Sequence, residues 1–341
     1  MQPATPSSTS TVASWRRAFV GSRTMAAAAL CVVFCALLMA SPVAARLGDS
    51  GAGAVAGVDA RTLYNRVHII GASASAGFGL RPPLPQGHPG RMQPLSLTRI
   101  AQAAAAGGAV TGDATSLFFV SPITTGKHQV QAVLSAKDKP TLVMGVDYLF
   151  WFTYGAADAE RQPIKQEAQR LAMLEVGLAN LDLLVKAGIP VVVGDLPNMS
   201  QAVGKMLSPA QMPKQETLDA ANKRIRAWAA ERSLTTVVPL AELVLQLDGD
   251  TPFQAGSRTW STKADGPLIQ ADRLHPTFAG SVALLARAEQ ATTEHYRPGE
   301  APGMATTAFE HDPAKVAKSL QKLIEADLAA RNPAAQAPAP R

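Results

Sequence analysis

Three residues that could together carry out nucleophilic catalysis lie at opposite ends of the chain. Asp272 and His275 stand three residues apart, directly before Pro276, and Ser73 stands on a glycine-rich turn after an apolar run. In a Ser-His-Asp triad the histidine takes the proton of the serine hydroxyl, and the carboxylate fixes the histidine tautomer and stabilises the imidazolium. The sequence therefore predicts a serine nucleophile, a histidine base and an orienting aspartate.

Each of these residues also has a structural interpretation. Ser73 could cap the helix that follows it, since serine is a favoured residue at helix N-termini. Asp272 could be a cap or loop residue, and His275 could simply end a loop before a helix. Ser75, two residues farther into the same turn, is a second candidate nucleophile. Only the agreement of spacing, chain order and strand placement favours the catalytic interpretation.

Alternating apolar and amphipathic segments predict the elements that position these residues. Apolar runs that are typical of buried parallel strands occupy residues 67–70, 108–111, 141–146, 189–193 and 235–240. Helical spacing of apolar residues covers 163–187, 218–232, 276–295 and 312–328. This alternation predicts a three-layer α/β sandwich whose ligands bind at the carboxyl ends of the strands. Ser73, Asp147 and Asp195 each follow a predicted strand, so we expect them at one rim.

The two outer motifs resemble those of the SGNH (GDSL-type) hydrolases. The first is Gly71-Ala72-Ser73-Ala74-Ser75-Ala76-Gly77, and the last is the Asp-x-x-His-Pro of residues 272–276, followed by Gly280. The resemblance covers about residues 67–294. It implies a flavodoxin-like α/β/α sandwich with a parallel sheet of about five strands. It also implies that Ser73 is the nucleophile, His275 the base and Asp272 its orienting partner, with no cofactor.

The inner motifs depart from the family pattern. Ala72 replaces the usual aspartate, which is not the triad acid. The resemblance makes Gly112 the backbone donor of the oxyanion hole, but Asp147 stands where the family has an asparagine donor. An ionised carboxylate accepts hydrogen bonds and donates none. Asp147 could donate if protonated, or it could turn away to bind a substrate hydroxyl or a neighbouring backbone group.

Two further residues near the predicted rim are candidates for substrate binding. Trp151 belongs to an aromatic cluster that could line an acyl or sugar pocket, although core packing explains it equally well. Asp195 could shape the substrate site, although a structural turn role is favoured. No group of His, Asp and Glu residues has the spacing of metal ligands, so we predict no metal.

The first 45 residues differ from the rest of the chain. They carry Arg16 and Arg17, then an apolar run over 25–39, then small residues that end in Ala45. This pattern predicts a secretory signal peptide and export to the periplasm or the medium, by the general or the twin-arginine route. The alternative is an uncleaved membrane anchor, because residues 25–45 carry no charge.

The remaining chain is predicted to form one domain over residues 61–331, between a flexible lead-in (46–60) and a disordered Pro/Ala-rich tail (332–341). Both cysteines, Cys31 and Cys35, lie in the leader, so the mature chain has no thiol nucleophile. The net charge of +6 includes the three arginines of the leader. No Lys/Arg cluster is interleaved with aromatic residues, which argues against nucleic-acid binding.

These features together predict an exported serine hydrolase that cleaves carboxylic esters. The expected partner is a small-molecule or polysaccharide-linked ester substrate, with no nucleic acid, and with a membrane only if the N-terminal segment stays uncleaved. The alternatives are a carbohydrate O-acyl esterase or acyltransferase of the same fold, and a non-catalytic binding protein that kept the fold. Asp147 is the residue that favours the last alternative.

Overall fold

The computed structural model describes residues 62–297 and 307–331. The predicted signal peptide, the lead-in and the Pro/Ala-rich tail lie outside the described residues. Among the helices that are described, none has both the length and the apolar character needed to cross a bilayer.

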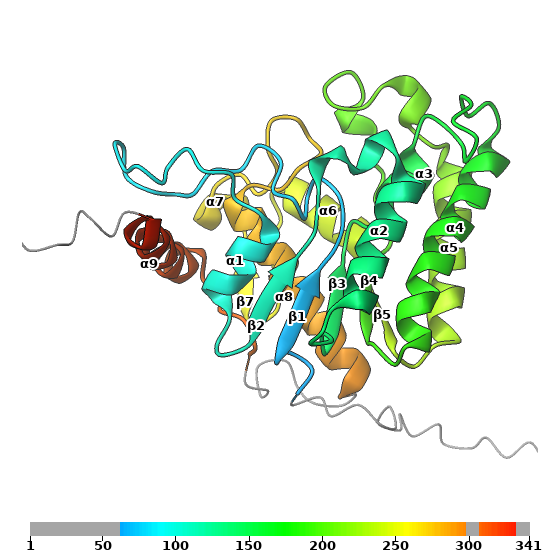
Figure 1. The fold of residues 1–341 in the computed structure, drawn as a ribbon. Helices are drawn as coiled ribbons and strands as arrows, with labels where there is room; N and C mark the ends of the chain where they lie inside the picture. The colour runs from blue at the N-terminus through cyan, green and yellow to red at the C-terminus, as the bar shows by residue number, and fades with distance from the viewer. Residues whose placement is uncertain (1–61, 298–306, 332–341) are drawn as a thin grey trace, which may run out of the picture. The chain divides into compact units, whose positions relative to one another are not determined.

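Five parallel strands form the central sheet (Figure 1). They are β1 (Arg66–Ile69), β2 (Ala109–Gly112), β3 (Leu142–Gly145), β4 (Val191–Gly194) and β5 (Thr235–Val238). Their order across the sheet is β2-β1-β3-β4-β5, and every neighbouring pair is parallel. This is the flavodoxin-like order, whose strand direction places ligands at the carboxyl edge. The predicted fold class and all five strands are confirmed.

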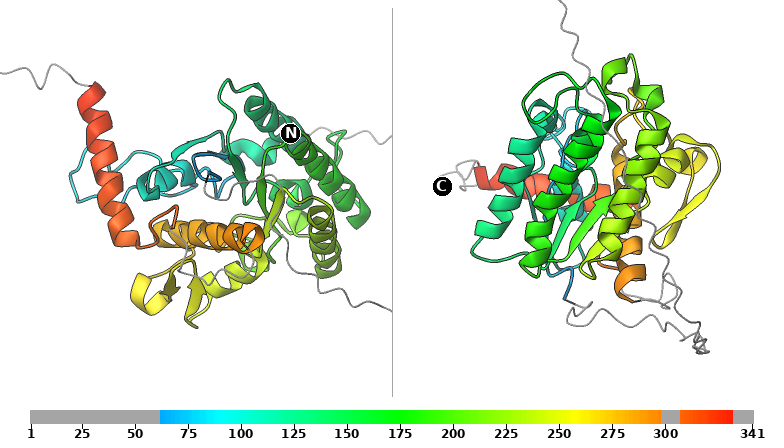
Figure 2. Two further views of the ribbon diagram at one scale, coloured as in Figure 1. Left: turned by 90° about the horizontal axis from the view of Figure 1, so that it is seen from below. Right: turned by 90° about the vertical axis from the view of Figure 1, so that its right-hand side faces the viewer.

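Helices cover both faces of the sheet (Figures 1 and 2). One face carries α1 (Leu97–Ala104), α6 (Leu240–Asp248), α8 (Phe278–Tyr296) and α9 (Pro313–Arg331), and the other carries α2 (Pro122–Ser135), α3 (Phe150–Tyr154), α4 (Glu167–Lys186) and α5 (Gln215–Ala230). Helix α9 packs on α1. The predicted helices α4, α5, α8 and α9 are confirmed, with boundaries that shift by a few residues.

The smaller elements lie in the connections. A hairpin of β6 (Phe253–Ala255) and β7 (Arg258–Trp260) and the short α7 (Thr262–Asp265) separate α6 from α8. Single 3₁₀ turns occupy η1 (Ser116–Val120), η2 (Ser200–Ala202) and η3 (Pro209–Gln211). The connection that holds Asp272 and His275 therefore starts from the hairpin and α7, and it ends at the N-terminus of α8.

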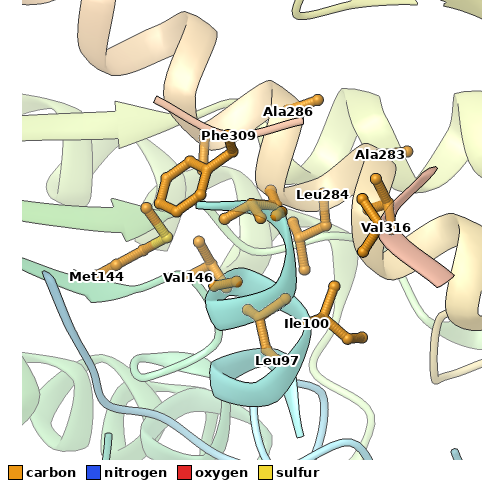
Figure 3. Packing of buried hydrophobic residues seen from close by; sticks show 14 of the residues in the cluster. Leu97, Ile100, Met144, Val146, Ala283, Leu284, Ala286, Phe309 and Val316 are labelled. Atoms are coloured by element: carbon orange, nitrogen blue, oxygen red, sulfur yellow. The ribbon is translucent and has the colours of Figure 1, made fainter. Parts of the chain in front are cut away.

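Alternation along the strands divides the core into two hydrophobic clusters. Met144 and Val192 belong to the cluster on the α1–α8 face, whereas Val143 and Val191 belong to the cluster on the α4–α5 face. Successive side chains of a strand point to opposite faces, so a strand buried on both sides is apolar throughout. Figure 3 shows part of the first cluster, including Val146 just beyond the end of β3.

Candidate active site

The turn after β1 holds Ser73 at the carboxyl edge of the sheet. The chain turns sharply at Gly71, whose φ of +143° is one that favours glycine. Backbone hydrogen bonds then close the turn, from Ala76 N to Ala72 O at 2.8 Å and from Phe78 N to Ser73 O at 2.9 Å. The turn is short and held by its own backbone, so the Ser73 hydroxyl has a defined position.

The loop before α8 holds Asp272 and His275 in one compact turn. Asp272 Oδ1 accepts the backbone N–H groups of Leu274 at 2.9 Å and of His275 at 3.0 Å. Arg273 between them has a φ of +63°, and its guanidinium reaches Gln201 and Asp248. The Arg273 side chain thus anchors a backbone conformation that is costly for a non-glycine residue.

The structure brings these two segments together although they are 202 residues apart. His275 Nε2 lies 2.8 Å from Ser73 Oγ, and His275 Nδ1 lies 2.8 Å from Asp272 Oδ2. The His275 residue is only 2% exposed, and the Phe78 ring lies 4.7 Å from its ring between centroids. Because Nδ1 donates to the carboxylate, the Nε2 lone pair is free to accept the Ser73 proton.

The carboxyl group of Asp272 is held ionised. Partial burial alone would raise its pKa, but the N–H of Leu274 and the hydrogen bonds from the His275 side chain and backbone outweigh burial. The net effect is that the pKa of Asp272 lies below its usual value. A carboxylate in this state can keep Nδ1 of His275 protonated and can stabilise the imidazolium.

Asp147 accepts four hydrogen bonds from the turn of residues 71–78, called the nucleophile turn below after the predicted role of Ser73. Its Oδ1 accepts the N–H of Ala72 at 3.0 Å and the hydroxyl of Ser75 at 2.6 Å, and its Oδ2 accepts the N–H groups of Ala74 at 2.9 Å and Ser75 at 3.1 Å. Of the alternatives that the sequence leaves open, this is the one in which Asp147 binds neighbouring backbone groups. With four donors aimed at it, the carboxylate has no hydrogen to give to an oxyanion.

The same contacts separate the two candidate serines. Ser75 is fully buried, and its hydroxyl donates to Asp147. Ser73 is partly exposed, and its hydroxyl faces His275. Only Ser73 therefore has both a base within hydrogen-bond distance and access from outside.

Gly112, the predicted oxyanion donor, is the last residue of β2 and pairs with Ile69. A Cβ atom on it would lie 2.4 Å from Thr98 Oγ1 and 2.6 Å from Ile69 O, so close packing alone requires a glycine here. Gly112 is not among the residues that line the pocket beside Ser73. Its role as an oxyanion donor stays a prediction.

Gln129, which we did not anticipate from the sequence, clamps the nucleophile turn to the end of β2. Its buried side chain accepts Gly71 N–H at 3.0 Å and donates to Gly71 O and Asp113 O, both at 2.9 Å. A single glutamine on a helix carries no motif, so nothing in the sequence marks it.

The two predicted substrate-binding residues do not line the pocket beside Ser73. Trp151 is 5% exposed and packs edge-on against Phe150, at 5.1 Å between ring centroids, within the core. Asp195 accepts the N–H of Ala241 at 2.7 Å and pairs with Arg226 Nη1 at 2.6 Å. Asp195 thus binds the first turn of α6, which agrees with the structural role favoured above.

A pocket opens directly beside Ser73 and His275. Its walls are apolar side chains from α3, α6 and α8 and from the loops around them, including Phe150, Leu284 and Val146 just after β3. Its space outside atoms totals about 560 Å³, counting the part open to solvent, but little of this is wide enough for water. Among the described residues, no group of His, Cys, Asp and Glu side chains is arranged to hold a metal ion.

No family model matches the sequence, and no curated protein matches it. The chain is similar to a solved member of the lipolytic G-D-S-L family from Veillonella parvula, with 12% identity over 67% of this chain and 98% of that one, at a TM-score of 0.41. It is also similar to an acetylxylan esterase from Geobacillus stearothermophilus, with 16% identity over 68% of this chain and 94% of that one, at a TM-score of 0.37.

Proposed function

We propose that this protein is an ester hydrolase of the SGNH (GDSL-type) kind that works through Ser73, His275 and Asp272. The observation that carries the proposal is the pair of 2.8 Å contacts on either side of the His275 ring. They place the ring between the Ser73 hydroxyl, whose proton it can accept, and the Asp272 carboxylate, which stabilises the imidazolium that forms. The partial exposure of Ser73 and the pocket beside it give a substrate access.

The reaction follows from these contacts. Ser73 Oγ attacks the acyl carbon and passes its proton to His275 Nε2, and the imidazolium is stabilised by Asp272. The tetrahedral intermediate expels the alcohol, which takes the proton from Nε2, and an acyl group remains on Ser73. Water then gives its proton to Nε2 and attacks the acyl carbon. Release of the carboxylic acid returns the proton to Ser73.

The oxyanion of the intermediate needs donors that are already in place. The Asp147 carboxylate takes the N–H groups of Ala72, Ala74 and Ser75 but not that of Ser73. We assign the Ser73 N–H as one donor and the N–H of Gly112 as the other. Asp147 supports the Ser73 donor by fixing the turn from which that N–H projects.

The protein is exported in this proposal, with cleavage of its leader after Ala45. The charged start, the apolar run and the small residues before position 46 support this step. Retention of the segment would instead leave the enzyme anchored in the membrane.

Labelling with a fluorophosphonate tests the proposal. The full-length chain is expressed in a host that exports it, labelled, and examined by intact mass and peptide mapping. We expect one adduct on Ser73, no adduct in S73A or H275A, and a mature chain that begins at Arg46. A folded protein that takes no label would favour the non-catalytic alternative. An adduct on Ser75 would overturn the assignment of the nucleophile.

A further inference from the structure

The pocket beside Ser73 is nearly free of polar side chains that could bind a substrate. Of its lining residues, only Ser73, His275 and Asp147 carry polar side chains. The His275 nitrogens face Asp272 and Ser73, and both oxygens of Asp147 are occupied by the nucleophile turn. A sugar or a charged group entering this pocket would lose its hydrogen bonds to water without replacing them.

The inner end of the pocket is formed by the hydrophobic core. Val146, Leu247 and Leu284 line it and are only 2%, 3% and 4% exposed. A cavity with such walls stays dry and takes apolar ligands. The part of the pocket that is wide enough for water is small, so it has room for one unbranched chain and not for a branched or aromatic group.

Helix α6 sets the length of one wall. Leu240, Val244 and Leu247 all line the pocket from this helix. Leu240 and Leu247 are seven residues apart, or about 10 Å along the helix axis, which is roughly the length of an extended octanoyl chain. Val244 lies between them and is partly exposed.

The closed inner end suits the part of the ester that stays on Ser73. The alcohol must leave for solvent with the proton from His275, whereas the acyl group remains attached to Ser73 Oγ until water arrives. Phe78 covers the His275 ring, is 40% exposed and does not line the pocket, so the outer side of His275 is the more open one.

We propose that this pocket binds the acyl group of the substrate, and that this group is an unbranched aliphatic chain of about octanoyl length rather than acetyl. The proposal rests on the proposed function, because it takes Ser73 as the residue that becomes acylated. The pocket then selects for an apolar acyl group and does not restrict the alcohol group of the ester.

Two isomeric esters separate an acyl pocket from an alcohol pocket. Methyl octanoate and heptyl acetate have the same composition but carry the long chain on opposite sides of the ester. Each methylene that enters the pocket raises kcat/KM about four-fold, so we expect methyl octanoate to be preferred by at least about 100-fold. Equal rates, or a preference for heptyl acetate, would overturn the proposal.

Substitutions on α6 locate the effect in the pocket. V244F places an aromatic ring in the pocket. We expect the ratio of kcat/KM for methyl octanoate to that for heptyl acetate to fall at least about ten-fold. L245F is the matched control, because Leu245 is 70% exposed on the same helix and does not line the pocket. It should keep the wild-type preference. If V244F does not fold, V244M gives the same test with a flexible side chain, and a wild-type preference in the folded variant would contradict the proposal.

The outcome can be told apart from a failure of the proposed function. A protein that is labelled on Ser73 and cleaves heptyl acetate, but prefers it over methyl octanoate, is an esterase without this acyl pocket. A folded protein that is not labelled and cleaves neither ester refutes both proposals.

Discussion

Four hydrogen bonds converge on the carboxylate of Asp147, and together they shape the turn that presents Ser73. The close approach explains Gly71, because a Cβ atom there would lie 2.1 Å from Asp147 Oδ1. At this position a carboxylate is better suited than an amide, since all four partners are donors. Asp147, which stands where the family has an asparagine donor, therefore supports the turn of the proposed nucleophile Ser73.

Substitution of Asp147 gives the most specific prediction for a single residue. D147N restores the family's asparagine, but it places an NH₂ group against N–H donors at one of the two oxygen positions. We expect the substitution to lower kcat/KM by about 100-fold and the free energy of unfolding by about 1–3 kcal/mol. Ester hydrolysis and denaturant unfolding of D147N beside the wild type check this. An equal or faster enzyme would mean that position 147 donates to the oxyanion.

At the scale of elements, α6 joins the rim of the sheet to the acyl pocket. Asp195, just after β4, accepts the N–H of Ala241 in the first turn of α6. The same carboxylate pairs with Arg226 of α5. A single buried side chain thus ties the helix that lines the pocket to the end of a central strand.

Removing this side chain should affect stability more than chemistry. We expect D195A to lower the free energy of unfolding by about 1–3 kcal/mol, because it leaves the N–H of Ala241 without its partner. Hydrolysis of an acetyl ester should change only a few-fold. D219A, at an exposed position of α5, is the control for loss of a carboxylate. A large rise in KM for D195A with unchanged stability would show that Asp195 contacts substrate.

At the scale of the whole molecule, stability depends on groups whose pKa values shift on folding. Burial lowers the pKa of His68 in β1, and the partial compensation from Asp113 does not reverse this. The carboxyl pKa values of Glu167, Asp182 and Glu310 are also lowered: burial would raise them, but their hydrogen bonds and ion pairs outweigh it. Each of these groups binds its proton more tightly in the unfolded chain.

The free energy of unfolding should therefore fall in two steps as the pH is lowered. Below about pH 6.5 the unfolded chain takes up a proton at His68 before the folded chain does, and below about pH 4 the same holds for the carboxylates. Stability is fully present above each unfolded pKa and is lost toward each folded pKa. Denaturant unfolding between pH 7.5 and 3.5 measures this. H68Q should remove part of the first step and D182N part of the second. Stability that rises on acidification would contradict the assignment.

Local patterns account for what could be predicted. Strands β3 and β4 are short apolar runs buried on both faces, and such runs can be recognised in the sequence. Strands β1 and β2 are less buried, and in β2 only Val110 is buried, so its pattern is the weaker one. The long helices α4, α5, α8 and α9 repeat their apolar residues over several turns. The sequence does not predict the short α1 and α6, because few turns give little periodicity and much of their support is tertiary packing. It does not predict α2 either, because the buried face of this longer helix includes Gly126 and Gln129 and so lacks a clear apolar repeat. The β6–β7 hairpin is too short to stand out.

The sequence by itself determined the parallel α/β sheet and the candidate group of Ser73, Asp272 and His275, because each depends on spacing within a short segment. The tertiary structure decided the partners of Asp147, the burial of Ser75 and the place of Asp195. It also assembled the apolar pocket from several separate elements. These outcomes depend on contacts between residues dozens to hundreds of positions apart, and only the packed fold brings such atoms within hydrogen-bond distance.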